Sequence, residues 1–252
     1  MKSVKGKYIW IIGASSGIGA ALAKDLSRRG AIVALSARRE DALVTLKDDL
    51  QGDNHIVVAV DAADDESIQN AFQSVTDQFP RLDSAIFMAA SYTPHDGAPK
   101  ALSVVKDMIN VNLTGAFRMI DAVRPYFEKR GSGQIVLCAS VAGFRGLPTG
   151  QPYCATKAAL ISLAETLYVD LRPYNIDVKV INPGFVKTPL TDKNDFPMPM
   201  MIAADKAARE ISKGLVSRSF EINFPKAFIL IMKILNILPN FIYLWVSRKI
   251  SP

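Results

Sequence analysis

The sequence predicts an α/β fold in which helices flank a doubly wound sheet of seven parallel strands. Short apolar runs, such as residues 9–12, alternate with longer amphipathic segments, an order typical of repeated strand–helix–strand units. A glycine-rich turn at 13–19 joins the first apolar run to the first amphipathic segment. The 252 residues suffice for one such fold with a large core, and a hydrophobic content of 49% excludes a disordered chain.

The first half of the chain alternates strands with helices. Residues 8–12 are apolar and read as the first strand, and Gly30 separates the first helix from the second strand. His55 lies at a turn before the third strand, and we expect it at the surface. The expected elements are strands at 8–12, 31–36, 55–60 and 84–89, and helices at 17–29, 40–50 and 64–79.

The second half continues the pattern. A long helical region is expected at 101–129, and a buried strand at 133–140 ends in the hydroxyl of Ser140. The Ala-rich run 155–171 has apolar residues at helical spacing, and strands at 177–181 and 221–224 complete the sheet. Residues 191–201 hold too many prolines for a helix. We expect residues 1–224 to form one domain and residues 225–252 an apolar helical extension.

Four motifs carry the chemistry. Tyr153 and Lys157 lie one helical turn apart, so both side chains point the same way, and a fixed cation favours the phenolate form of tyrosine. Ser140 ends a strand upstream, Asn112 lies in the long helical region, and the turn reads G-A-S-S-G-I-G. In order and spacing these motifs resemble the classical short-chain dehydrogenase/reductase family over roughly residues 5–224.

The resemblance implies a Rossmann fold and a catalytic set. Tyr153 would exchange a proton with the substrate, Lys157 would bind the cofactor ribose, and Ser140 would hold the substrate oxygen. Asn112 would sustain a proton relay through a water bound at its backbone. Two departures stand out: Ile12 replaces the family's threonine, and F-M-A-A at 87–90 replaces N-N-A-G. We expect packing to hold the turn instead.

A nicotinamide dinucleotide is the expected cofactor. The glycines and the following helix N-terminus suit a pyrophosphate. The second strand runs into Ala37, Arg38 and Arg39 with no carboxylate before Glu40, which favours NADP over NAD, with Arg38 on the 2′-phosphate. Alternatively, both arginines simply begin the next helix in solvent. The expected cofactor contacts, several by resemblance alone, are Gly13, Ser15, Ser16, Gly17, Ile18, Gly19, Arg38, Arg39, Asp61, Ala62, Ala89, Tyr153, Lys157, Pro183, Gly184, Val186 and Thr188.

The 191–201 segment is apolar as well as proline-rich, and we interpret it as a substrate lid. A loop packed on its own core is the alternative. The apolar character favours a hydrophobic carbonyl or alcohol over a sugar. The expected substrate contacts are Phe144, Leu147, Phe196, Met198 and Met200.

Charge and cysteine usage limit the partners. The net charge is +6, but the basic residues are dispersed, so nucleic-acid binding is not expected. The two cysteines suggest no disulfide framework and agree with a cytoplasmic protein. No metal site is expected.

The segment 226–249 is apolar on all sides of two short predicted helices, with Tyr243 and Trp245 beside a basic end. Such helices can lie in a membrane interface, cover the substrate site or pack in a subunit interface. A single membrane-spanning helix is not expected, because Lys233 and Pro239 interrupt the run.

These observations predict an NADP-dependent oxidoreductase that moves hydride between nicotinamide and a hydrophobic ketone or secondary alcohol. A 3-oxoacyl thioester is the alternative substrate class. The alternative function is an NADP-binding sensor or membrane-associated scaffold without turnover. By resemblance we expect a homo-oligomer, either a dimer or a tetramer.

Overall fold

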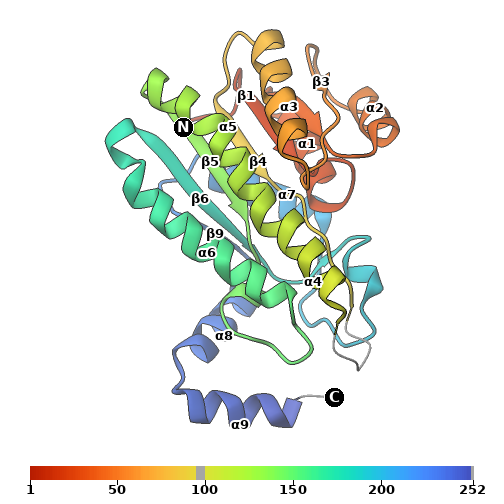
Figure 1. Cartoon of the computed structure of the whole chain (residues 1–252), viewed down its shortest axis with the longest axis vertical. Helices are drawn as coiled ribbons and strands as arrows, with labels where there is room; N and C mark the ends of the chain where they lie inside the picture. The colour runs from red at the N-terminus through yellow and green to blue at the C-terminus, as the bar shows by residue number, and fades with distance from the viewer. Residues whose placement is uncertain (95–99, 251–252) are drawn as a thin grey trace.

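The computed structural model describes residues 1–94 and 100–250 and is built on one seven-stranded parallel sheet, as predicted (Figure 1). The strand order is β3-β2-β1-β4-β5-β6-β9, so the chain reverses its direction of travel across the sheet between β1 and β4. Ligands of such sheets bind at this switch point, beyond the carboxyl ends of the strands. The strands are β1 (Tyr8–Ile12), β2 (Ile32–Ser36), β3 (Ile56–Val57), β4 (Ser84–Phe87), β5 (Gly133–Cys138), β6 (Ile176–Pro183) and β9 (Glu221–Phe224).

Helices cover both faces of the sheet, and the side chains of β1 show how. Successive residues of a strand point to opposite faces. Trp10 and Ile12 therefore pack with α3 (Asp65–Gln78), α5 (Gly115–Arg130) and α6 (Tyr153–Asp170) in one core. Ile9 and Ile11 enter a second core with α1 (Gly17–Arg28), α2 (Glu40–Asp48) and α7 (Ala204–Leu215).

The predicted surface position of His55 is wrong. The ring is buried because both nitrogens have backbone partners: Nδ1 accepts from the Val33 amide at 3.1 Å, and Nε2 lies 3.0 Å from the Gln51 carbonyl. The histidine thus takes a backbone donor of β2, and β3 pairs with β2 only at Ile56 and Val57. The third strand is accordingly shorter than the predicted 55–60.

The long helical region predicted at 101–129 is interrupted at Asn112. It consists of α4 (Leu102–Ile109), a π-helical turn (Asn110–Thr114) and α5. Such turns inside helices are frequent at functional sites, and Asn112 lies in the middle of this one. Further on, β7 (Val186–Lys187) pairs with β8 (Ile202–Ala203), and short 3₁₀ turns occur at Val141–Gly143, Arg172–Tyr174 and Thr191–Lys193.

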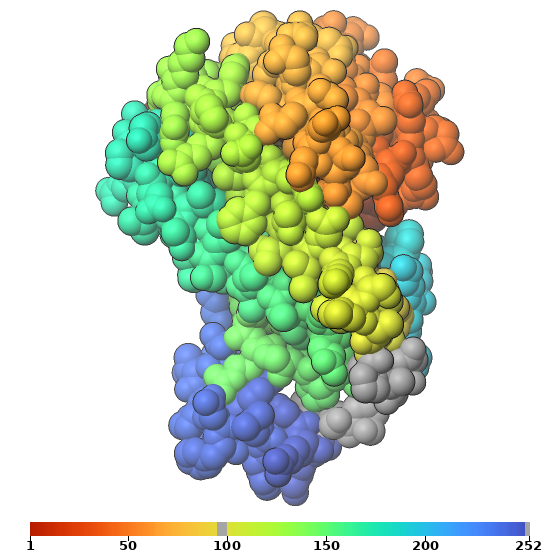
Figure 2. Space-filling model, viewed as in Figure 1, coloured from red at the N-terminus to blue at the C-terminus, as the bar shows by residue number. Residues whose placement is uncertain are grey.

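The C-terminal segment forms two helices, α8 (Lys226–Ile237) and α9 (Asn240–Ile250). They make up the lower end of the molecule in Figure 1, beyond the body of sheet and helices. In the space-filling view they form a distinct knob at that end (Figure 2). Across residues 1–94 and 100–250, no helix is both long and apolar enough to cross a membrane.

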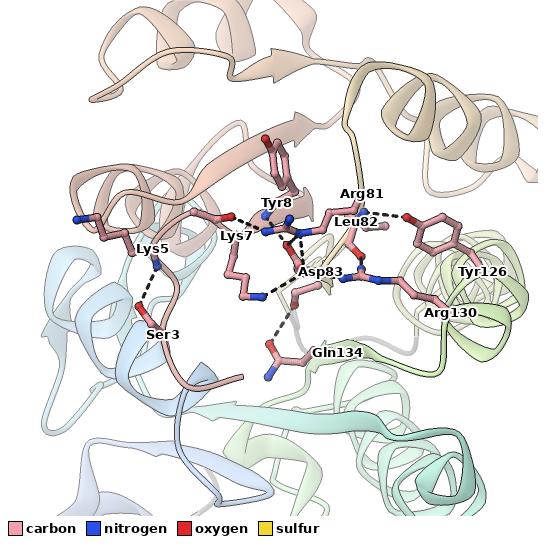
Figure 3. Close-up of polar contacts among 12 residues, drawn as sticks. Ser3, Lys5, Lys7, Tyr8, Arg81, Leu82, Asp83, Tyr126, Arg130 and Gln134 are labelled. Carbon is pink, nitrogen blue, oxygen red and sulfur yellow. Dashed lines mark hydrogen bonds and ion pairs between the residues drawn. The ribbon is translucent and has the colours of Figure 1, made fainter.

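A buried carboxylate, that of Asp83, joins several elements at the amino ends of β1 and β4 (Figure 3). Asp83, which precedes β4, accepts the Tyr8 amide of β1 at 3.1 Å. It also pairs with Lys7 at 3.3 Å, with Arg81 at 3.0 Å and with Arg130 of α5 at 3.0 Å. Burial alone would raise the pKa of Asp83, but the Tyr8 amide and the three cations outweigh it and hold that pKa below its ordinary value.

Replacement Asp83→Asn should therefore lower the free energy of unfolding at pH 7 by about 2–3 kcal/mol, because three cations lose their common partner. The contribution of a carboxyl whose folded pKa is depressed is present above its unfolded pKa of about 4 and is lost as the pH falls through the folded pKa. The difference in the free energy of unfolding between the wild type and Asp83→Asn should thus become smaller below about pH 4. Urea unfolding of both proteins at several pH values measures this difference.

The matched control is Asp49→Asn, which breaks only an exposed ion pair with Lys24 and should cost less than about 1 kcal/mol. Equal losses in the two variants would contradict the role given to Asp83.

Candidate active site

A cleft of about 710 Å³ opens at the carboxyl ends of the strands, around the switch point between β1 and β4. Every residue predicted to contact the cofactor lines it, as do Ser140, Tyr153 and Lys157. The sequence reasoning missed further lining residues, most of which directly adjoin predicted ones along the chain. They are Ile12, Ala37, Val60, Met88, Ala90, Val111, Cys138, Ala139, Pro189, Leu190 and Thr191.

The glycine-rich turn is held by close backbone packing. Gly13 has a φ of +98°, and a Cβ there would lie 2.5 Å from the amide nitrogen of Ala89, after β4. A Cβ on Gly19 would lie 2.2 Å from the carbonyl oxygen of Gly13. The Gly13 amide donates to the Ser36 carbonyl at 2.7 Å. These contacts fix the turn without the threonine and asparagines that the resemblance led us to look for.

Helix α1 presents a free N-terminus to the cleft. It begins at Gly17 with no side-chain cap and no acidic residue in its first turn. By contrast, Asp64 caps α3 by accepting the Ser67 amide at 2.6 Å, and α2 carries two acidic residues in its first turn. The first-turn amides of a helix lack partners within it and carry a partial positive charge. The α1 end is therefore suited to an anion.

Two arginines and one carboxylate lie at the β2 and β3 side of the cleft. Arg39 donates to the Ser15 hydroxyl at 3.2 Å, whereas Arg38 is exposed and makes no hydrogen bond or ion pair within the described part of the chain. Asp61 accepts the Ala63 amide through one oxygen at 2.9 Å. It is the one carboxylate among the described lining residues.

Tyr153, Lys157 and Ser140 meet at the other side of the cleft. Helix α6 begins at Tyr153, so Tyr153 and Lys157 occupy its first turns on one face, as predicted. The Lys157 ammonium lies 5.4 Å from the centre of the Tyr153 ring and donates to the Cys138 carbonyl at 2.8 Å. Ser140, just beyond β5, donates to the Pro183 carbonyl at 3.4 Å and accepts the Ala142 amide at 3.1 Å.

The pKa of Tyr153 is raised, whereas the sequence analysis expected the neighbouring lysine to lower it. Burial raises the pKa of Tyr153 far above its ordinary value, and the neighbouring thiols Cys138 and Cys154 add to the rise. The Ser140 hydrogen bond opposes it. Burial also lowers the pKa of Lys157, because its charge has left water. In this geometry Tyr153 is a neutral phenol with a proton to give.

Asn112 stands behind the cleft and does not line it. Its side chain is fully buried, accepts the Ser91 amide at 2.6 Å and donates to the Ser91 carbonyl at 3.0 Å. It also donates to the Thr156 hydroxyl at 3.2 Å, which donates in turn to the Tyr153 carbonyl at 2.8 Å. The side chain thus fixes the loop after β4 against the start of α6.

That loop supplies a residue the sequence reasoning overlooked. The ring of Tyr92 packs edge-on against the ring of Tyr153, with centroids 5.2 Å apart. Its hydroxyl donates to Asn194 at 2.7 Å, and Lys193 donates to its carbonyl at 3.3 Å. Tyr92 therefore joins Tyr153 to the 191–201 segment. A lone tyrosine in a loop gives no sequence signal for this.

The five residues predicted to contact the substrate do not line this cleft, and their contact with a substrate stays a prediction. Phe144 and Leu147 pack against α8. In the 191–201 segment, Phe196 meets Phe185 edge to face with centroids 6.1 Å apart, Met198 accepts from Asn194, and Met200 is exposed.

The short chain dehydrogenase family model matches residues 7–197. A protein named uncharacterized oxidoreductase from Myxococcus xanthus is 33% identical over 242 residues, covering 95% of this chain and 96% of that relative. A short chain dehydrogenase from Burkholderia cenocepacia, solved with NADP, superimposes with a TM-score of 0.83 at 23% identity, covering 99% and 100% of the two chains. A 3-ketoacyl-(acyl-carrier-protein) reductase from Brucella melitensis, solved with NADH, gives a TM-score of 0.80 at 24% identity, covering 88% and 98%.

The extent of the family match and the identity to a relative along almost its whole length agree with the fold and with the arrangement of the cleft. The chain belongs to the short chain dehydrogenase family of oxidoreductases.

Proposed function

We propose that the protein is an NADP-dependent reductase or dehydrogenase acting on hydrophobic ketones or secondary alcohols. One observation carries the proposal: Tyr153, together with Ser140 and Lys157, lines the same cleft as the uncapped α1 N-terminus and Arg38. A proton donor and an anion site thus share one cavity, as transfer from a phosphorylated cofactor requires.

The described residues fit a nicotinamide dinucleotide. The cleft volume falls within the range of about 300–1,000 Å³ usual for cofactor and ligand sites. The α1 N-terminus suits the pyrophosphate, and Asp61 has an oxygen available for the adenine amino group. Arg38, which has no other partner in the described chain, suits a 2′-phosphate. Bound NADPH would supply the hydride.

The chain's own residues would position the substrate and move the proton. Ser140 would hydrogen-bond the substrate oxygen and stabilise the charge that develops on it during reduction. Tyr153, kept protonated by burial, would give its proton to that oxygen. Lys157, on the same face of α6, would bind the ribose beside it, and Asn112 would hold the start of α6 and the Tyr92 loop in register.

The substrate class follows from the apolar lining. Met88, Ala90, Cys138 and Leu190 contribute apolar surface to the cleft that also contains Tyr153. We infer a hydrophobic carbonyl compound. A 3-oxoacyl thioester is the second candidate, since the structurally similar Brucella protein is a 3-ketoacyl-(acyl-carrier-protein) reductase.

We infer that the protein forms a homo-oligomer through its α4, α5 and α6 face. Large apolar side chains are exposed there, and such surface is usually covered by another molecule. They are Leu102, Ile109, Phe117, Tyr168 and Val169.

Both cysteines are free and buried, which supports a cytoplasmic location.

Turnover is tested with Tyr153→Phe, which keeps the ring and removes the proton. With NADPH and a panel of apolar ketones, kcat should fall by at least about 100-fold, while the NADPH dissociation constant stays within about threefold. The control is Tyr168→Phe, an exposed tyrosine of the same helix. Full activity in Tyr153→Phe, or cofactor binding without turnover in the wild type, would sink the reductase proposal and leave the sensor.

Cofactor choice is tested with Arg38→Ala. NADPH should bind about 10- to 100-fold more weakly to the variant, because a charge-assisted hydrogen bond to the phosphate is lost, and NADH binding should hardly change. Fluorescence titration of both cofactors measures this, with exposed Arg28→Ala at the far end of α1 as control. Equal or tighter NADH binding by the wild type would contradict the NADP assignment.

Tyr92→Phe tests whether the tyrosine loop positions the substrate. The variant keeps the ring against Tyr153 and the Lys193 bond to the Tyr92 carbonyl, but it frees Asn194, so the 191–201 segment loses one of its two hydrogen bonds to Tyr92. We expect the ketone KM to rise several-fold, with NADPH affinity unchanged. Tyr174→Phe, exposed and remote, is the control. A fall in kcat alone would point to proton transfer rather than positioning.

A further inference from the structure

The C-terminal helices α8 and α9 are fixed to the body of the protein by their inner sides. Gly184 allows close packing, since a Cβ there would lie 2.7 Å from the Phe228 ring, and Phe228 also stacks on Phe185 with centroids 5.4 Å apart. Ile229 and Met232 are buried with Val141. This inner side of α8 is therefore fully used, and its other side faces outward.

Arg145 and Tyr243 hold α9 in the same way. Arg145 donates to the Asn236 carbonyl at 2.7 Å and to the Asn240 side chain at 2.6 Å, and its guanidinium lies 4.4 Å from the centre of the Tyr243 ring. The Tyr243 hydroxyl donates to the Gly146 carbonyl. These contacts fix which face of α9 is outward.

The outward faces of both helices are apolar. In α8 they carry Leu230, Ile231, Ile234 and Ile237, and in α9 they carry Phe241, Leu244 and Trp245. The spacing of three and four residues places each set on one helix face. Ile237 is 80% exposed, Phe241 75% and Trp245 60%. We call these seven side chains the terminal patch. They lie on the knob that ends the molecule in Figure 2.

The charged side chains on the two helices are all basic, and one of them, Lys233, is paired with Glu221 of β9. The sequence contains no acidic residue after Glu221, while Lys226, Arg248 and Lys249 are exposed on the two helices. Arg248 follows Leu244 and Trp245 on the same face of α9, and the Lys249 ammonium lies 4.6 Å from the centre of the Trp245 ring. Apolar side chains bordered by cations and an aromatic residue match the boundary between acyl chains and anionic headgroups.

A second copy of this chain fits the patch less well. A two-fold contact would bring the same basic residues of two helices together without a compensating carboxylate. The exposed apolar face of α4, α5 and α6 is a separate surface available for subunit contacts.

We propose that the terminal patch docks on the surface of an anionic phospholipid bilayer, with α8 and α9 lying along it. The contacts of Phe228 with Gly184 and Phe185 would then hold the mouth of the cleft close to the lipid. The proposal does not depend on the substrate or on turnover.

The chain offers its own optical probe. It has two tryptophans, of which Trp10 is fully buried in the sheet and Trp245 is exposed on the patch. Vesicles of phosphatidylcholine with about one third phosphatidylglycerol should shift the Trp245 emission to the blue and bring the protein down on centrifugation. The emission shift should vanish in Trp245→Phe, leaving Trp10 unchanged, and binding should weaken with salt.

Two variants separate the contributions. Phe241→Ser combined with Leu244→Ser should weaken vesicle binding at least about tenfold by removing apolar contact. Arg248→Glu combined with Lys249→Glu, which leaves the packed face untouched, should do the same by reversing two charges. Val44→Ser on α2, 46% exposed and far from the patch, is the matched control and should bind like the wild type.

Light scattering on the same proteins identifies the competing occupant. Failure of the full-length wild type to bind anionic vesicles would overturn the proposal. A patch variant that dissociates an oligomer, with no vesicle binding by the wild type, would assign the face to a second copy. Equal binding to pure phosphatidylcholine vesicles would overturn the role of the basic residues.

Discussion

The site depends on three backbone segments meeting where no side chain fits. Gly13 rests on the backbone after β4, and Gly19 rests on Gly13. This contact sets the entry of α1 relative to the carboxyl ends of β1 and β4. The packing of these two glycines therefore places the free N-terminus of α1 at the switch point between β1 and β4, where the cleft opens. Apolar residues at 87–90 are compatible with it because the contact is made by main chain, not by side-chain amides.

A second constraint is the burial of polar groups around Tyr153. Asn112, Thr156 and Lys157 are nearly inaccessible to water, and each has a hydrogen-bond partner. Buried networks that are fully satisfied fix geometry more firmly than apolar contacts do. The same burial raises the pKa of Tyr153.

The sequence predicted the parts that follow from local rules. Strand periodicity, the glycine turn and the i, i+4 relation of Tyr153 and Lys157 are local, and the structure brings these residues together in one cleft. The features that the sequence did not predict depend on tertiary contacts. His55 is buried with its ring bonded to the distant Val33 amide and to the nearby Gln51 carbonyl, and Phe144 packs against α8. The part played by Tyr92 arises only when loops from opposite halves of the chain meet.

The guanidinium of Arg145 joins the loop before α6 to the last two helices through the Asn236 carbonyl and the Asn240 side chain. Phe144 packs on α8 from the same loop. A chimera that took the C-terminal extension of a relative without its matching loop would therefore leave the Arg145 donors unpaired and Phe144 uncovered. An exchange of C-termini within this family should include residues 144–147.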